Sequence, residues 1–258
     1  MERVRRILPT VTAVLLILIV WQIWVSRSGI SPNVMPSPIA IGQALVDSWP
    51  SLWPAAQVTA LESFVGFVLA IACGIALGMA FYISRTLKSA LFPLLYAAQT
   101  MPLISIAPLF LIWFGFDISG KIIIVAIFGL FPIAVQTIRG LEAVPRFYTD
   151  VALTCGASNA WTLWHVKLRV AARHIFGGIR ISAAYTVATA ATAEYLGSRS
   201  GLGIWLQAAY NSFRTPLVFC ATIVIIAMTC VLLVAVNASE LLLIGPASDD
   251  EDPDADQL

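Results

Sequence analysis

Charged residues are scarce in this sequence. Only 11% of its 258 residues are Asp, Glu, Lys or Arg, whereas 59% are hydrophobic. Six of the 14 acidic residues stand in the last ten positions, so the first 248 residues hold only eight. A soluble globular domain carries about twice this share of charge, and a nucleic-acid-binding domain would show a basic stripe that is missing here. The composition therefore argues against both classes.

The patterns that mark enzyme and metal sites are also missing. The four cysteines show no C-x-x-C spacing, and His165 and His174 have no Cys, Asp or Glu cluster at ligand spacing. No motif pairs a nucleophile with a base. Residues 115–122 (GFDISGKI) nearly match a phosphate-binding loop, but Ile122 replaces the hydroxyl residue that would hold magnesium. We therefore expect no catalytic residue, metal or cofactor on this chain.

Long apolar runs are what the sequence has in abundance. Six runs of about 17 residues or more carry little or no charge, which is the length that a helix needs to cross a bilayer. Because a helix satisfies its own backbone hydrogen bonds in lipid, each run is a candidate span. We predict an all-α integral membrane protein with six transmembrane helices, at residues 7–26, 63–84, 89–116, 122–138, 175–196 and 215–239.

The distribution of Lys and Arg predicts the orientation of these spans. Basic residues are retained on the cytoplasmic side during membrane insertion. With six spans, eleven Lys and Arg residues fall on one side, and four fall on the other, namely Arg27, Lys121, Arg199 and Arg214. We therefore expect both termini to lie in the cytoplasm.

The same pattern divides the chain into segments. Residues 1–27 are expected to form a cytoplasmic flank and the first span, and the Pro- and Trp-rich residues 28–56 an extracytoplasmic loop with a short interfacial helix. Residues 57–243 would hold five spans and a cytoplasmic loop at 141–174. The acidic residues 244–258 are expected to be a disordered cytoplasmic tail.

Two spans carry residues that predict how they pack. Small residues recur every four positions from Gly66 to Gly78, which lets another helix approach closely. The third span is interrupted by Pro102 and Pro108. Proline bends a helix and frees backbone carbonyls, which is tolerated where neighbouring helices or a water-filled cavity supply partners. The bend therefore indicates either a packing kink or a helix that lines a pathway.

Polar side chains inside the spans are the candidates for such a pathway. Glu194 stands at the end of the fifth span, where an acidic side chain is costly unless it faces water or a partner. It could equally be an interfacial carboxylate that faces water. The candidate pathway-lining residues are Gln99, Thr100, Ser105, Gln136, Thr137, Thr189 and Glu194.

The stretch between the fourth and fifth spans predicts a short helix outside the membrane. This helix should end near Gly156, because glycine permits the turn into a second segment. Such a helix would either dock on a partner or connect the spans as an amphipathic segment at the membrane surface.

This stretch resembles the EAA loop of binding-protein-dependent ABC importer permeases, whose core reads E-A-A-x-x-x-G. Arg169 and Arg173 stand where that family usually has prolines. The resemblance implies a role in coupling to an ATPase for the residues that match the loop and its downstream elements: Asp150, Val151, Ala152, Gly156, Ala157, Ser158, Val166, Leu168, Gly178 and Arg180.

Further motifs in the same order narrow the resemblance to the nitrate, sulfonate and taurine branch of these permeases. They are spread over nearly the whole chain, so together they are more specific than any one alone. The matching segments are residues 35–38 (MPSP), 102–115 (PLISIAPLFLIWFG), 131–140 (FPIAVQTIRG), 193–194 (AE) and 201–203 (GLG).

The resemblance implies a type I importer fold in a bacterial plasma membrane. The partners would be a cytoplasmic ATP-binding subunit, an extracytoplasmic solute-binding protein and a second permease subunit, expected to be another copy of this chain. The solute would be of the nitrate, sulfonate or taurine type, or a vitamin precursor such as hydroxymethylpyrimidine or riboflavin. The alternative is an ATP-independent secondary transporter or channel, which would have no need for a cytoplasmic docking helix.

Overall fold

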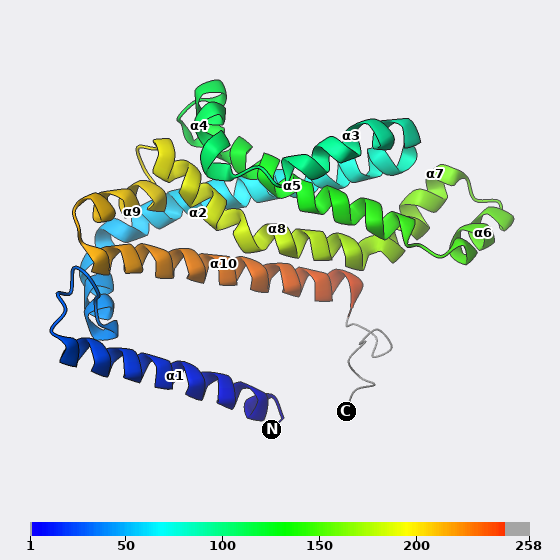
Figure 1. Ribbon diagram of the computed structural model, residues 1–258. Coiled ribbons are helices and arrows are strands. Elements are labelled where there is room, and N and C mark those ends of the chain that lie inside the picture. Colours follow the sequence, from blue (N-terminus) through cyan, green and yellow to red (C-terminus); the bar gives the residue numbers. More distant parts are fainter. Residues whose placement is uncertain (1, 246–258) are drawn as a thin grey trace.

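The chain is helical throughout the part that the structure describes (Figure 1). The computed structural model describes residues 2–245, with the side chains of residue 9 and residues 11–245. No strand occurs among them, so the all-α prediction is confirmed. The elements are α1 Glu2–Ser28, α2 Pro38–Ile83, α3 Arg85–Ala98, α4 Leu103–Phe114, α5 Ile118–Glu142, α6 Arg146–Thr154, α7 Asn159–Thr162, the π-helix η1 Leu163–Lys167, α8 Leu168–Gly197, α9 Leu202–Asn211 and α10 Thr215–Ile244.

Within residues 2–245, four helices are long and apolar enough to cross a membrane, namely α1 (from Val11), α2, α5 and α10. The pair α3 and α4 adds a fifth if the two count as one broken span. The expected count of six is therefore not confirmed. The helix that falls short is α8, whose predicted span is built largely from Ala, Gly and Thr. A helix that packs against its neighbours along much of its length needs less apolarity than one that faces lipid.

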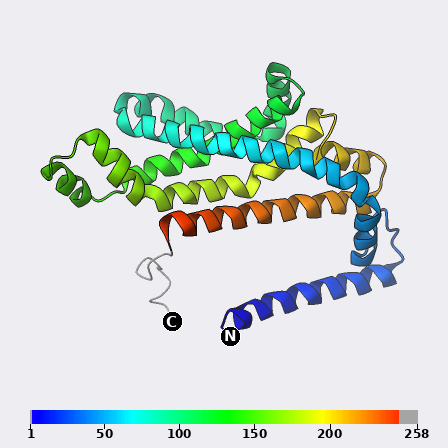
Figure 2. The ribbon, with the colours of Figure 1, turned by 180° about the vertical axis from the view of Figure 1, so that it is seen from behind.

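Helix α2 differs from the expectation of a loop at residues 28–56. It begins at Pro38, after Ser37, whose hydroxyl accepts a hydrogen bond from the Ala40 amide at 3.2 Å, and it runs without a break to Ile83. Serine as the N-cap and proline in the first turn both favour a helix start. Pro50 and Pro54 lie inside the helix, and Figures 1 and 2 show that its first part bends away from the rest. Proline inside a helix produces such a bend.

The centre of the molecule is α5, which packs between α2 and α8. The predicted row of small residues on α2 faces α5. A methyl group added at Gly66 would lie 2.6 Å from Val125, and one added at Gly78 would lie 2.6 Å from Thr137. The two helix backbones thus approach as closely as the missing side chains allow. The packing role predicted for this row is confirmed.

The third predicted span is broken into two helices. Helices α3 and α4 meet at an angle of 109° across residues 99–102, and Pro102 is the residue before α4. Pro108, by contrast, lies inside α4. Of the two prolines, Pro102 therefore marks the break.

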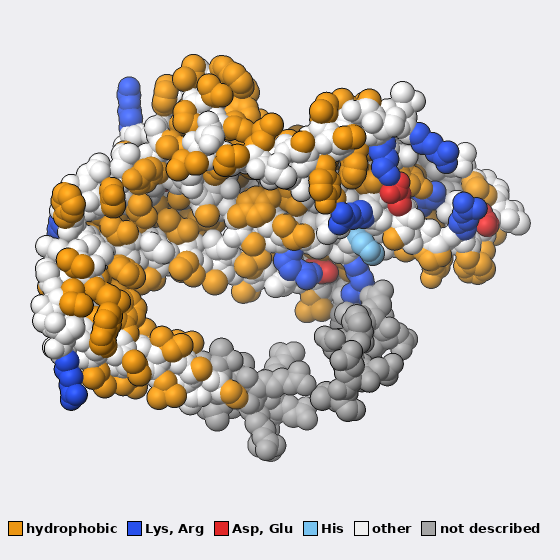
Figure 3. All heavy atoms as spheres, viewed as in Figure 1, with side chains coloured by type: hydrophobic (Ala, Val, Ile, Leu, Met, Phe, Trp, Pro, Cys, Tyr) orange, Lys and Arg blue, Asp and Glu red, His pale blue; other side chains and the backbone are white. Residues whose placement is uncertain are grey.

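The molecular surface is apolar over most of its length. Helix α1 lies apart from the bundle in both views, with 6% of its apolar window buried (Figures 1 and 2). Figure 3 shows hydrophobic side chains over most of this face, whereas the charged side chains gather toward the end that carries α6. The predicted acidic tail lies outside the described residues, apart from Ile244 and Gly245.

Candidate functional site

Residues 146–158, called here the projecting segment, form a short helix and a tight turn beyond the end of the bundle (Figure 1). Helix α6 ends at Thr154, and Gly156 has a φ of +86°, which suits glycine. The Ala157 amide donates to the Ala152 carbonyl at 3.1 Å and closes the turn. Ser158 then caps α7. The predicted helix ending near Gly156 is confirmed.

The projecting segment exposes apolar side chains. None of the residues of α6 is buried, and Phe147 and Val151 are 69% and 47% exposed. A cavity of about 810 Å³ opens between α6 and the start of the next helix. It is lined by Phe147, Tyr148, Val151, Ala152, Cys155, Gly156, Ala157, Ser158, Trp161 and Val166. An exposed apolar patch on a short projecting helix is typical of a surface that binds another protein.

Charged side chains lie on the bundle side of the same segment. Asp150 is exposed on α6 and lines a second cavity of about 780 Å³, together with Arg85, Lys88, Arg146 and Lys167. Glu142 also lines this cavity and pairs with Lys88 at 2.5 Å. The projecting segment thus combines an apolar face with a charged one.

The predicted downstream coupling residues divide into two groups: Val166 lines the cavity beside the projecting segment, whereas Gly178 and Arg180 lie within the bundle. Val166 and Leu168 are half-buried where η1 passes into α8. Gly178 is buried against α5, where an added methyl group would lie 2.9 Å from Gln136, and Arg180 forms an ion pair with Glu240 of α10. Gly178 and Arg180 therefore hold α8 in the bundle.

The two arginines at the usual proline positions lie inside a continuous helix. Helix α8 runs from Leu168 to Gly197 and includes both Arg169 and Arg173. Proline at these places would remove backbone donors and disturb the helix. The change to arginine therefore suits the uninterrupted path from η1 into α8.

The predicted pathway residues fall into two groups. Gln99, Thr100 and Ser105 are exposed around the break between α3 and α4, and Gln136 is half-buried on α5. The others are buried: Thr137 donates its hydroxyl to the Ile133 carbonyl at 2.7 Å and faces Gly78, and Thr189 and Glu194 lie inside the bundle. The sequence therefore did not distinguish polar residues at the surface from those that pack.

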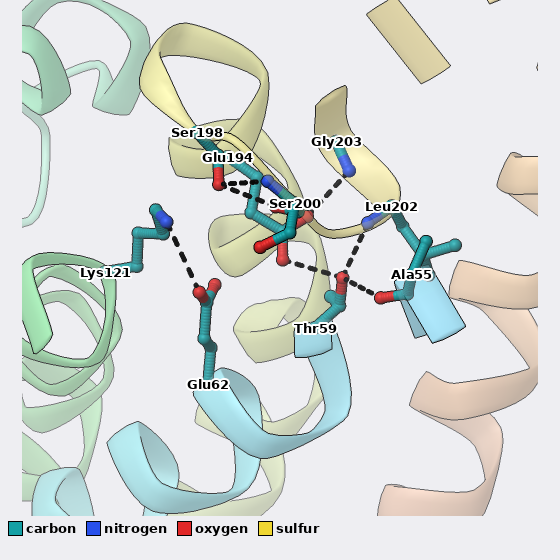
Figure 4. Close-up of polar contacts among 9 residues, drawn as sticks. All are labelled: Ala55, Thr59, Glu62, Lys121, Glu194, Ser198, Ser200, Leu202 and Gly203. Carbon is teal, nitrogen blue, oxygen red and sulfur yellow. Dashed lines mark hydrogen bonds and ion pairs between the residues drawn. The ribbon is translucent and has the colours of Figure 1, made fainter. Parts of the chain in front are cut away.

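Glu194 belongs to a buried polar network that joins α2, α8 and α9 (Figure 4). Its carboxylate is fully buried and accepts hydrogen bonds from the Thr59 hydroxyl at 2.7 Å and from the Gly203 amide at 2.6 Å. The Thr59 oxygen in turn accepts from the Leu202 amide at 2.8 Å. Both carboxylate oxygens therefore have a partner, as a buried charge requires.

An ion pair lies beside this network. Lys121 of α5 stands 3.5 Å from Glu62 of α2, with side-chain exposures of 2% and 0% (Figure 4). Neither Glu62 oxygen has a hydrogen bond within the described part of the chain. We call Thr59, Glu62, Lys121, Glu194 and the 201–203 turn the Glu194 cluster. It connects the middle of α2 with the start of α5, the end of α8 and the start of α9.

The Gly-Leu-Gly sequence after α8 is explained by this cluster. Gly201 has a φ of +108°, and a methyl group there would lie 2.2 Å from the Glu194 carboxyl. A methyl group at Gly203 would lie 2.0 Å from the Ala191 carbonyl. Only glycine lets the turn close over the carboxylate.

The sequence did not identify Thr59, Glu62 and Lys121 as site residues. Glu62 and Lys121 each stand beside the end of a predicted apolar run, and only Lys121 was assigned to a side of the membrane, the one opposite the cytoplasm. The available signal was that an acidic and a basic residue each stand at the edge of a span. A charge in such a place is costly unless it has a partner of opposite sign.

Comparison with known proteins agrees with this architecture. Residues 66–243 match the family described as binding-protein-dependent transport system inner membrane component. The chain is 31% identical over 220 residues to the formylaminopyrimidine transport permease of Halalkalibacterium halodurans, covering 85% of this chain and 88% of that one. It is also 31% identical to the riboflavin transport permease of Chloroflexus aurantiacus (89% and 87% covered) and 28% identical to the taurine transport permease of Escherichia coli (89% and 86% covered).

Among solved structures, an inward facing form of the methionine ABC transporter MetNI has a similar fold. The TM-score is 0.57 at 17% identity, and the match covers 73% of this chain and 97% of that chain. The family match covers more than half of the described helices and agrees with the curated relatives. The chain therefore belongs to the binding-protein-dependent inner membrane components, as an ABC importer permease of the nitrate, sulfonate and taurine branch.

Proposed function

We propose that this chain forms the translocation pathway of an ATP-driven importer and that its projecting segment receives movement from a separate ATP-binding subunit. The observation that carries the proposal is the exposed apolar surface of α6, which includes Phe147 and Val151. In water this surface is unfavourable, and a groove on a partner would bury it. The charge of Asp150 beside it would fix the orientation of that partner.

The position of the segment supports a route for this movement. It lies between α5 and α8, which pack against each other and, through α5, against α2. A displacement of α6 would therefore move closely packed helices together, because packed cores shift between discrete arrangements instead of deforming gradually. ATP-driven closure of the partner would change the side of the membrane to which the pathway is open, as alternating access requires.

The remaining parts of the importer follow from the same assignment. The partners would be a cytoplasmic ATP-binding subunit, an extracytoplasmic solute-binding protein and a second copy of this permease. Residues 141–174 would be the coupling loop, and both termini would lie in the cytoplasm with it. The relatives named above transport formylaminopyrimidine, riboflavin and taurine, and the solute here would be a small polar organic or anionic molecule of this range.

The pathway would use the polar residues that remain accessible. Gln99, Thr100 and Ser105 surround the helix break, and Gln136 is half-buried on α5 beside Gly178 of α8. Thr137, Thr189 and Glu194 would support the pathway by holding its helices in place, since their side chains are buried.

A charge reversal at Asp150 tests the coupling assignment. The importer is reconstituted in vesicles with its ATP-binding subunit and solute-binding protein, and uptake of radiolabelled formylaminopyrimidine, riboflavin and taurine is measured with and without ATP. We expect ATP-dependent uptake of one probe. Asp150→Arg should lower both uptake and capture of the ATP-binding subunit at least about tenfold, because it reverses the charge that would orient the partner.

Asp117→Arg is the matched control, since Asp117 is also exposed but precedes α5, outside the coupling loop. Normal assembly and uptake in Asp150→Arg would contradict the assignment. Uptake by the wild type that needs no ATP would instead identify a secondary transporter.

A further inference from the structure

A small cavity lies where the break after α3 faces α5 and α8. Its volume is about 240 Å³, and it is lined by Gln99, Phe128, Phe131, Pro132, Ile181 and Tyr185. Gln99 follows the last residue of α3, so the broken helix presents an amide side chain to this cavity. Interrupted helices place binding groups at such points in transporters.

Aromatic side chains dominate the lining. The rings of Phe128 and Phe131 lie 6.4 Å apart at 72°, an edge-to-face arrangement that holds the two rings in fixed positions. Tyr185 donates its hydroxyl to the Phe128 carbonyl at 3.3 Å, which fixes the tyrosine ring against α5. The cavity therefore offers pre-positioned ring faces to a flat ligand.

The cavity offers a neutral hydrogen-bonding group to a ligand. The side-chain amide of Gln99 makes no hydrogen bond within the described part of the chain, so both its NH2 group and its oxygen are open to a ligand. An amide can pair with a group that both donates and accepts, such as the edge of an aminopyrimidine. It supplies no charge to either a cation or an anion.

Among the residues that the structure describes, no cationic side chain lines the cavity. Arg180, which precedes the lining residue Ile181, is paired with Glu240. Lys121, near the start of α5, is paired with Glu62. A sulfonate or nitrate ion entering the cavity would lose water without gaining an opposite charge, which is strongly unfavourable.

From this geometry we infer that the cavity is a binding station on the translocation pathway for a neutral planar heteroaromatic solute of the aminopyrimidine class. The ring would stack on Phe128 and Phe131, and its polar edge would pair with Gln99. This inference rests on the proposed transport function, whose solute range it narrows from small polar organic or anionic molecules to neutral heteroaromatic rings.

Binding to the full chain in lipid nanodiscs tests the inference without the ATP-binding subunit or the solute-binding protein. Saturation-transfer difference NMR detects weak binding, and formylaminopyrimidine is the probe, with taurine and nitrate as competitors. We expect saturable transfer to the ring protons of the probe that neither competitor displaces. Phe131→Leu should weaken binding about tenfold, because it keeps apolar bulk but removes the stacking face. Gln99→Leu should weaken it about fivefold through the lost hydrogen bonds.

Two substitutions of the same kinds outside the cavity serve as controls. Phe64→Leu removes a ring that is 62% exposed on α2, and Gln57→Leu removes an exposed amide. Both should bind the probe like the wild type. Thermal unfolding of each variant shows whether Phe131→Leu remains folded, and Gln99→Leu, at an exposed position, provides an independent second test.

Each result is decisive for this inference. Absence of ring transfer, displacement of the probe by taurine or nitrate, or equal binding in Phe131→Leu, Gln99→Leu and the controls would overturn it. The reconstituted uptake assay remains a separate measurement. ATP-driven uptake without binding at this cavity would leave the transport function standing, whereas binding without uptake would retain the cavity and remove the function.

Discussion

The Glu194 cluster and the projecting segment differ in which side chains they bury and which they expose. In the cluster, charged and polar groups are buried and find their partners on other helices of the same chain. In the projecting segment, apolar groups such as Phe147 are exposed, and the structure of this chain leaves them uncovered. Both arrangements are costly in isolation.

The contrast separates two kinds of function. A buried network that joins α2, α5, α8 and α9 stabilises the fold of this chain, so changes within it should lower stability first. An exposed apolar surface contributes little to the fold, so changes there should affect association first. The following substitutions test this division, beginning with the largest expected loss of stability.

Lys121→Met should have the largest effect. It leaves the buried Glu62 carboxylate without its cation, and removing one partner of a buried ion pair costs about 3–5 kcal/mol. Thermal unfolding in detergent should show a much lower midpoint. The double variant Glu62→Gln/Lys121→Met removes both charges and should recover most of the loss. If Lys121→Met unfolds like the wild type, the pair does not stabilise the cluster.

Gly203→Ala should rank next. The added methyl group would lie 2.0 Å from the Ala191 carbonyl, so the turn over Glu194 must shift, at a cost of about 3 kcal/mol. Gly177→Ala is the matched control, because nothing lies within 4 Å of a methyl group there. The control should unfold at or slightly above the wild-type temperature, and a similar loss in both variants would contradict the close fit of the turn.

Thr59→Val should cost less, about 2 kcal/mol, since it keeps the side-chain shape but removes the hydroxyl that joins Glu194 to the Leu202 amide. Hydrogen exchange of the amides in residues 201–203 should become faster. Thr59→Ser should restore the protection. Thr222→Val, which loses only a bond within α10, should leave this turn unchanged, and equal exchange in all four proteins would exclude Thr59 as the link.

Val151→Asp should have the smallest effect on stability, within about 0.5 kcal/mol, because Val151 is exposed. Its effect on association should instead be large, since a charge would enter an apolar contact surface. Co-purification of the ATP-binding subunit measures this effect beside thermal unfolding. Loss of stability together with unchanged association would reverse the division drawn above.

The sequence predicted much of the fold because lipid imposes simple rules. Long charge-free runs predicted the helices, and Gly156 predicted the end of the short helix. The row from Gly66 to Gly78 predicted a close helix contact, which the structure shows to be with α5. The predicted count of six spans was not confirmed, because α8 packs through small residues and is less apolar than the helices that qualify as spans. The continuation of α2 back to Pro38 was also missed, because its prolines favoured a loop.

The polar residues were harder to place. Periodicity marks a polar residue in a span but does not show whether it faces a cavity or another helix, so Thr137 and Gln99 were grouped together. The partners of Glu194 lie 135 and nine residues away in the sequence, and such contacts depend on how the helices pack. Only the structure brings Thr59, Glu62 and Lys121 into one cluster.

The most direct test of the account is a photo-cross-link from position 151 in native membranes. A photoreactive amino acid replaces Val151, and the adduct is identified by mass spectrometry after irradiation. The account predicts a cross-link to an ATP-binding polypeptide, formed on the cytoplasmic side. A projecting segment that forms no adduct with another chain, or whose Cys155 is labelled by an impermeant maleimide from outside the cell, would contradict it.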